Sequence, residues 1–179
     1  MDAKTLLRNR RSVRKYTDDV VPKEVLDDVF ELTVRAPSWK NCQIARYTII
    51  QDKDIIDKIA DQGVNDFVYN TKNLKYAHNL CVLSYVKGIS GKNNDEYATS
   101  KKDWEVFDAG IAAHQFCLSL QANNLGSVIL GIIDPAYIAE LIDLPKEEAV
   151  AALIIFGYPN DEVSYTSRLP IEEIVRYKQ

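Results

Sequence analysis

The stretch that decides the fold is AGIAAHQFCLSLQ, residues 109–121. Apolar residues occupy nearly every side of a helix drawn through it, which is typical of a helix buried at the centre of a protein. We expect this helix to run from about Lys101 to Asn123 and to stop at the polar sequence NNLG. The apolar run SVILGII at 127–133 then predicts a strand, with Gly131 inside it.

Helices and strands are mixed along the rest of the chain. Apolar residues at helical spacing, and caps such as Asp52 and the Asp134-Pro135 pair, indicate where helices begin. The expected elements are helices over 2–9, from Pro22 through Thr33, over 52–62, 65–76 and 134–143, and strands over 46–51, 79–86 and 149–157. At most four strands, with helices dominant, favour an α+β layer fold over a helical bundle. The segment 88–100 is the one flexible-looking stretch.

The composition is that of an ordinary globular protein. The 179 residues are 46% apolar, which is enough for one domain over 1–179, and the formal net charge is −4. A pI near 5.3 argues against nucleic acid and membrane partners, which usually need a basic face. No apolar run has the length of a signal peptide or a membrane span. Cys42, Cys81 and Cys117 are scattered, so neither a disulfide framework nor a metal site is expected, and a cytoplasmic location fits best.

A basic cluster, RNRRSVRKY at residues 8–16, stands out against this acidic balance. If the segment is extended, Arg10, Ser12 and Arg14 project to the same side. Two guanidiniums and a hydroxyl on one side would make a phosphate clamp, because guanidinium matches phosphate geometry bidentately. On spacing alone, a solvated basic turn between two helices is about as plausible as a phosphate clamp. A nucleic-acid-binding arm is a third reading, weakened by the lack of aromatic residues beyond Tyr16.

Two further stretches are candidates for ligand contact. The loop APSWKNCQ at 36–43 is rich in hydrogen-bond donors, although a plain polar turn would look the same. Gly131 lies in a predicted strand, where glycine often marks close approach by a ligand or another backbone, and also serves core packing. His78 and His114 flank apolar runs, and both are interpreted as structural.

Five segments in sequence order resemble the nitroreductase family of FMN-dependent oxidoreductases. They are RRSVRKY, APSWKNCQIARYTII, WEVFDAGIAAHQFCLSLQANNLGSVILGIID, ALIIFGYP and SRLPIEEIV. The resemblance implies an α+β fold with a central mixed or antiparallel sheet flanked by helices. It also implies an entwined homodimer with two FMN sites at the subunit interface. The C-terminal tail, about 165–179, would pack on the partner subunit.

The resemblance also implies which residues bind the flavin. Arg10, Ser12, Arg14 and Arg168 would bind the phosphate and ribityl chain, with Arg11 giving main-chain or ring contacts. The isoalloxazine ring would contact Pro37, Ser38, Trp39 and Asn41 of the partner, the backbone at Leu130 and Gly131, Asn70 and, more weakly, Asn73. Trp39 and Lys40 would line the substrate slot. No catalytic side chain and no metal is required, because hydride enters and leaves at flavin N5.

The implied activity is ping-pong: NADH or NADPH reduces FMN, and a nitroaromatic, a quinone or a similar small electrophile then takes the same slot. The chain departs from the family pattern at Thr166, where a basic residue is often found, and at Trp39, where smaller residues are common. We therefore hypothesise that Trp39 narrows or roofs the slot. A flavin-binding protein of the same fold with a storage or sensing role is the alternative.

Overall fold

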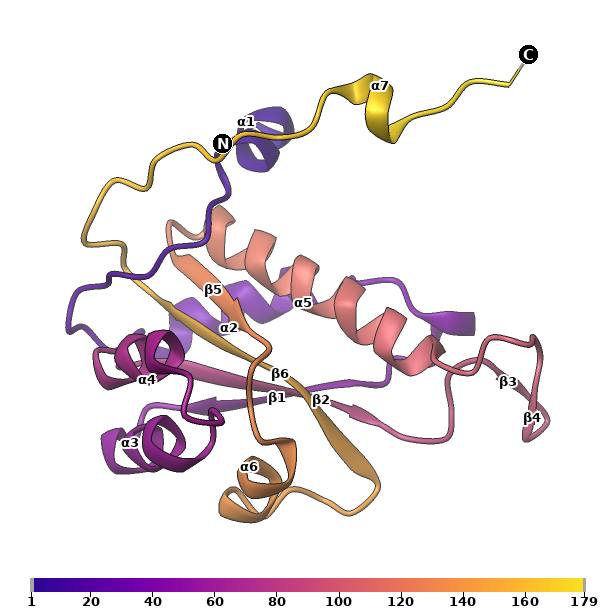
Figure 1. Cartoon of the computed structure of the whole chain (residues 1–179), viewed down its shortest axis with the longest axis horizontal. Helices are drawn as coiled ribbons and strands as arrows, with labels where there is room; N and C mark the ends of the chain where they lie inside the picture. The colour runs from indigo at the N-terminus through magenta and orange to yellow at the C-terminus, as the bar shows by residue number, and fades with distance from the viewer. Residues whose placement is uncertain (1, 179) are drawn as a thin grey trace.

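The computed structural model describes residues 2–178, and its centre is a four-stranded antiparallel sheet (Figure 1). The strand order is β1-β2-β6-β5. The strands are β1 (Ala45–Ile50), β2 (Leu80–Val86), β5 (Gly126–Leu130) and β6 (Glu148–Gly157), and each neighbouring pair is antiparallel. The predicted α+β class with an antiparallel central sheet is confirmed.

Helices cover both faces of this sheet (Figure 1). The helices are α1 (Ala3–Asn9), α2 (Lys23–Thr33), α3 (Lys53–Gln62), α4 (Val68–Lys75), α5 (Trp104–Ala122), α6 (Pro135–Leu141) and α7 (Ile171–Ile174). One face carries α2 and α5, and the other carries α3, α4 and α6. Because successive side chains of a strand point to opposite faces, the central strands are apolar at nearly every position.

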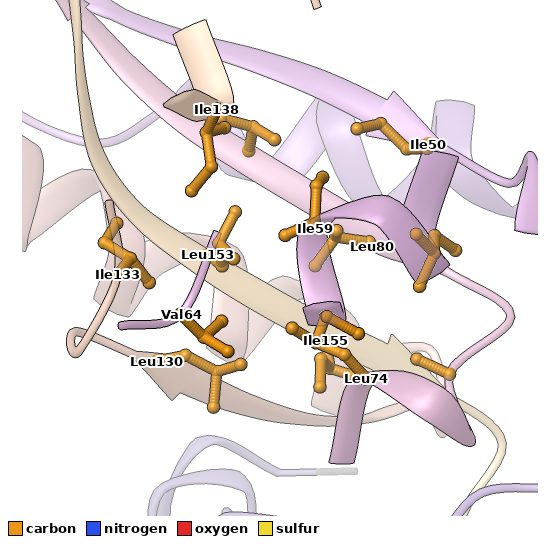
Figure 2. Packing of buried hydrophobic residues seen from close by; sticks show 14 of the residues in the cluster. Ile50, Ile59, Val64, Leu74, Leu80, Leu130, Ile133, Ile138, Leu153 and Ile155 are labelled. Carbon is orange, nitrogen blue, oxygen red and sulfur yellow. The ribbon is translucent and has the colours of Figure 1, made fainter. Parts of the chain in front are cut away.

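The core beneath α3, α4 and α6 is built from interlocking aliphatic side chains. Figure 2 shows Ile59, Leu74 and Ile138 of these helices meeting Leu80 and Leu153 of the sheet. All five are fully buried. Burying a branched aliphatic side chain contributes roughly 1.5–3 kcal/mol, so this layer fixes the sheet on which the site is built.

Helix starts follow the sequence signals closely. The Asp52 carboxylate accepts hydrogen bonds from the N–H groups of Asp54 and Ile55, as an N-cap does. Asp134 caps α6 in the same way, with Pro135 as the first helical residue. Pro22 is itself the N-cap residue of α2, one position outside the first turn in which we expected it.

Two predicted elements are shorter than expected. The helix expected over 65–76 begins at Val68, because Asn65 and Asp66 have φ of 49° and 55°. Such left-handed conformations stop a helix, and Asn and Asp tolerate them. The strand expected over 127–133 ends at Leu130, so Gly131 follows the strand and does not lie inside it.

The segment 88–100 is a structured hairpin, which corrects the expectation of a flexible stretch and of four strands at most. It contains β3 (Lys92–Asn93) and β4 (Glu96–Tyr97), which pair antiparallel. Asn94 and Asp95 between them have φ of 50° and 67°. Two consecutive positive φ values are the requirement of the two-residue hairpin turn that matches strand twist.

The long helix α5 packs on the sheet as expected of a central helix, but one stripe of it is exposed in this chain. It begins at Trp104, three residues later than expected. Val106, Phe107, Gly110 and His114 are exposed along one stripe. The first part of this stripe, Val106 and Phe107, is apolar.

The C-terminal segment runs outward from the end of β6 and passes α1 (Figure 1). Residues 159–178 are exposed along their whole length, including α7, which was not predicted. The expected packing of this tail on a partner subunit stays a prediction. Within residues 2–178, no helix has both the length and the apolar character needed to cross a membrane.

Candidate functional site

The basic segment is extended and lies against the edge strand β5. The Val13 N–H donates to the Ser127 carbonyl at 2.9 Å, and Ser12 and Ser127 form a parallel bridge. The two backbones approach closely because residue 126 is glycine: a Cβ there would lie 2.6 Å from Val13 Cγ2. With Val13 buried, alternation turns Arg10, Ser12 and Arg14 to the other side, as the extended reading predicted.

These three side chains line a hollow of about 340 Å³ between β5 and α5, which we call the arginine hollow. Its residues are Arg10, Ser12, Arg14, Gly110, His114, Cys117, Ser127, Val128 and Ile129. Guanidiniums and hydroxyls are strong donors to phosphate oxygens. No carboxylate lines this hollow among residues 2–178.

Arg168 lies next to this cluster although it is far away in the sequence. A second hollow of about 590 Å³, the tail hollow, is lined by Leu7, Arg8, Asn9, Arg10, Arg11, His114, Tyr165 and Arg168. Arg10 and His114 border both hollows. Arg10 thus lies beside Arg14 in one hollow and beside Arg168 in the other, and the role of these arginines toward a phosphate stays a prediction.

The arginines of this cluster form no ion pair among the described residues, although Asp161 and Glu162 line a neighbouring hollow beside Arg14. Every ion pair among residues 2–178 is made by a lysine or by His78, and none by an arginine. Arg11, Arg14 and Arg168 instead donate through Nη1 to backbone carbonyls. Unpaired guanidiniums gathered in a concave surface of an acidic protein create a local positive potential that attracts an anion.

Sequence reasoning missed the three other polar residues of the arginine hollow, His114, Cys117 and Ser127. His114 was interpreted as structural, yet it is exposed and borders both hollows. His114 lies four residues after Gly110, so the two residues share one face of the helix. A polar ring next to a glycine on one helix face was the sequence signal that could have indicated an open surface. Ser127 and Cys117 also line the hollow. Burial raises the pKa of the Cys117 thiol, which keeps it protonated and unreactive.

The backbone just after β5 is open at Gly131. A Cβ on Gly131 would meet no atom within 4 Å. Asn70, buried on α4, donates its side-chain N–H to the Ile132 carbonyl at 2.9 Å. The Leu130 side chain is buried in the opposite core, so only its backbone is available to a ligand. Asn70 is therefore tied to the segment just after Gly131, and the roles of Asn70, Leu130 and Gly131 toward a flavin stay predictions.

The loop 37–41 is not brought to the arginine hollow of its own chain. Pro37 and Ser38 line a separate hollow of about 180 Å³ beside Asp108 and Ala112. In one chain, the predicted site therefore exists as two separate parts.

Trp39 is partly exposed and is held by the hairpin. Its ring lies 4.9 Å from the Trp104 ring, measured between centroids, and its Nε1–H donates to the Lys92 carbonyl at 3.1 Å. Lys40, with φ of 45°, donates from Nζ to Asn93 Oδ1 at 2.9 Å. The 88–100 hairpin therefore fixes both residues predicted to line the substrate slot, and Trp39 is not turned into the core.

Asp108 ties this loop to α5. It is 4% exposed, and its Oδ2 accepts from the Trp39 N–H at 3.0 Å and from Ser90 Oγ at 2.6 Å. The Cys42 thiol also donates to it, at 3.7 Å. One buried oxygen thus fixes the loop, the hairpin and the helix relative to one another. A buried acceptor of this kind rigidifies the groups that it joins.

We expect Asp108→Ala to lower the free energy of unfolding by about 1–3 kcal/mol, because the buried donors of Trp39 and Ser90 lose their acceptor. Urea denaturation followed by circular dichroism measures the change. Asp103→Ala, at the exposed start of the same helix, is the matched control and should change stability by less than about 0.5 kcal/mol. Equal effects of the two substitutions would contradict the structural role of Asp108.

Known proteins share this sequence and architecture. An NADH dehydrogenase from Thermus thermophilus is 26% identical over 204 residues, covering 99% of this chain and 97% of that protein. An FMN reductase (NAD(P)H) from Bacillus subtilis is 26% identical over 185 residues, covering 94% and 70%. A crystal structure of a nitroreductase from Desulfovibrio desulfuricans in complex with FMN superposes with a TM-score of 0.80 at 25% identity, covering 98% and 96%. A family model described as the nitroreductase family matches residues 7–158. Because this match covers most of its length, the chain belongs to the nitroreductase family.

Proposed function

We propose that the protein is an FMN-dependent oxidoreductase that takes electrons from NADH or NADPH. It passes them to nitroaromatics, quinones or similar small electrophiles. The observation that carries the proposal is the arginine hollow, whose guanidiniums have no carboxylate partner among the described residues. The similarity to an FMN reductase and to a nitroreductase crystallised with FMN supports it.

The donor set of the hollow fits a phosphate monoester. Arg10 and Arg14 supply guanidiniums, and Ser12 and Ser127 supply hydroxyls. The open side of Gly131 leaves the backbone accessible to a flat ring farther along β5. When bound, FMN would accept a hydride from the nicotinamide and deliver it to the oxidant.

The protein's own residues bind and orient the cofactor and exclude water. An apolar hollow of about 330 Å³ adjoins the arginine hollow, sharing Gly110 and Ile129 with it. This hollow extends to Ala152 of β6. The next residue of that strand, Leu153, pairs with Leu130 of β5. A phosphate held at Arg10 therefore leaves an apolar trough for the ring beside Ile129. Donors at the Gly131 backbone would stabilise charge that develops on a reduced ring.

The assembly that we propose is a homodimer of single-domain subunits. The loop 37–41 is remote from the arginine hollow of its own chain, so the partner would supply Ser38, Trp39 and Asn41 to the ring. The exposed stripe of α5 would be buried between subunits, with the 165–179 tail on the partner. A native mass near twice 20.3 kDa in light scattering is the expected result. A monomer that binds flavin fully would contradict this assembly.

The proposed partners are small molecules, with neither nucleic acid nor membrane among them, and the proposed location is the cytoplasm. Three free thiols, Cys42, Cys81 and Cys117, suit a reducing compartment.

We expect the purified protein to be yellow, to release FMN on denaturation, and to be bleached by NADH or NADPH without oxygen. Absorption spectra in an anaerobic cuvette measure all three. A yellow protein that neither donor bleaches would favour a storage or sensing role. A colourless protein that takes up no FMN would defeat the proposal.

A further inference from the structure

Two asparagine side chains hold the backbone that leaves the sheet after β5. The Asn65 Nδ2 donates to the Ile133 carbonyl at 2.8 Å, and the Asn70 Nδ2 donates to the Ile132 carbonyl at 2.9 Å. Neither carbonyl lies in a strand or a helix, so these amides supply the partners that regular secondary structure would otherwise give. Two consecutive peptides are therefore held by the connection between α3 and α4 and by α4 itself.

The peptide between Ile133 and Asp134 is held at both ends. Asn65 binds its carbonyl, and its N–H, that of Asp134, donates to the Gly63 carbonyl at 2.8 Å. Because a peptide is planar, two hydrogen bonds at its opposite ends fix the orientation of the whole unit. The Asp134 carboxylate caps α6, so this peptide is also fixed to the start of that helix.

The N–H groups just before this peptide have no backbone partner. Those of Gly131, Ile132 and Ile133 make no hydrogen bond to another backbone group of residues 2–178. A Cβ at Gly131 would meet no atom within 4 Å, and Ile132 is 47% exposed, so the backbone is accessible there. The segment therefore has fixed carbonyls and open donors, an arrangement suited to a hydrogen-bond acceptor on a ligand.

Asn65 has a backbone conformation that few residues adopt. Its φ is 49°, in the left-handed region, where Asn is tolerated better than most other residues. Residues in such conformations persist where their surroundings hold them, and they cluster at functional sites. Asn65 lines none of the described hollows, so it can act on a ligand only through the backbone that it holds.

We propose that Asn65 is a positioning residue of the flavin site, which aims the Gly131 N–H at the edge of the ring that gains negative charge on reduction. The inference rests on the proposed function, because the ring is that of FMN. A donor that is oriented in advance stabilises developing charge without reorganisation. A segment released from Asn65 has to be reoriented first, so loss of the amide weakens the binding of reduced FMN more than that of oxidised FMN.

Asn65→Gly is the test variant, because glycine adopts the left-handed conformation freely and only the amide is lost. Asn94→Gly is the matched control. Asn94 is also left-handed, with φ of 50°, and it is exposed in the turn between β3 and β4.

The first measurement is made on flavin-free protein, by hydrogen exchange followed with nuclear magnetic resonance. We expect the Asp134 N–H to exchange about tenfold faster in Asn65→Gly than in the wild type, because the other end of its peptide is released. The second measurement is an anaerobic reductive titration of FMN-loaded protein against a dye of known potential. We expect about a tenfold loss of affinity for reduced relative to oxidised FMN, which is a two-electron potential lower by about 30 mV. Asn94→Gly should leave both quantities unchanged.

Faster exchange at Asp134 with an unchanged potential would make Asn65 a purely structural residue and overturn the proposal. Unchanged exchange would overturn it as well, because the segment would then be held without Asn65. Both of these outcomes leave the FMN enzyme intact. Failure of the wild type to bind FMN would instead overturn the proposed function, and this inference with it.

Discussion

Phe116→Ala is expected to lower the free energy of unfolding by about 3–5 kcal/mol, the range for removing a buried aromatic ring. Phe116 is fully buried on the inner side of α5. Its ring centroid lies 5.5 Å from those of Phe30 and Tyr47 and 5.8 Å from that of Phe156. These partners come from α2, β1 and β6 and cannot all close on the space left behind, so a cavity adds to the lost burial.

Urea denaturation of flavin-free protein, followed by circular dichroism, measures the change. Phe67→Ala is the matched control, because Phe67 is 36% exposed and precedes α4 at the surface. It should cost less than about 1 kcal/mol. If Phe116→Ala cost no more than the control, the packing of α5 on the sheet would be weaker than the contacts indicate.

Arg10→Gln is expected to weaken FMN binding about 10- to 150-fold, with little effect on folding. A hydrogen bond to a charged group contributes about 1.5–3 kcal/mol, and each 1.4 kcal/mol corresponds to about a tenfold change in affinity. Arg10 is chosen because it borders both hollows, so its loss lowers the positive potential of the whole cluster. FMN is titrated into flavin-free wild-type protein and into flavin-free Arg10→Gln, and the quenching of FMN fluorescence gives the dissociation constant of each.

Arg35→Gln provides the comparison, because Arg35 is exposed just after α2 and lines none of the described hollows. It removes the same charge and should leave the FMN dissociation constant within about twofold, because Arg35 lines neither the arginine hollow nor the tail hollow. FMN affinity that is unchanged in Arg10→Gln would place the phosphate outside the arginine hollow.

Local signals predicted the parts of the fold that depend on neighbouring residues. Asp52 and Asp134 cap helices as their positions indicated, because a cap needs only its own side chain and the next three N–H groups. The alternation of Arg10, Ser12 and Arg14 likewise required nothing beyond extended backbone.

Features that depend on distant contacts were not predictable in this way. The apolar character of α5 could not show that one stripe is left open by its own chain. The hairpin turn at Asn94 and Asp95 looked like flexibility, yet Trp39 and Trp104 pack together beside it and fix the hairpin. The partnership of Arg168 with Arg10 has no trace in sequence spacing, so only the family resemblance pointed to it.

The bridge between Ser12 and Ser127 also sets the order in which the site forms during protein synthesis. The arginine segment leaves the ribosome early, but β5 and then β6, against which β5 pairs, are made after most of the chain. Until those strands emerge, the Val13 N–H has no partner and Arg10 has no fixed direction. We therefore expect that flavin does not assist folding of the first half of the nascent chain. Flavin would bind only after the nearly complete polypeptide has folded.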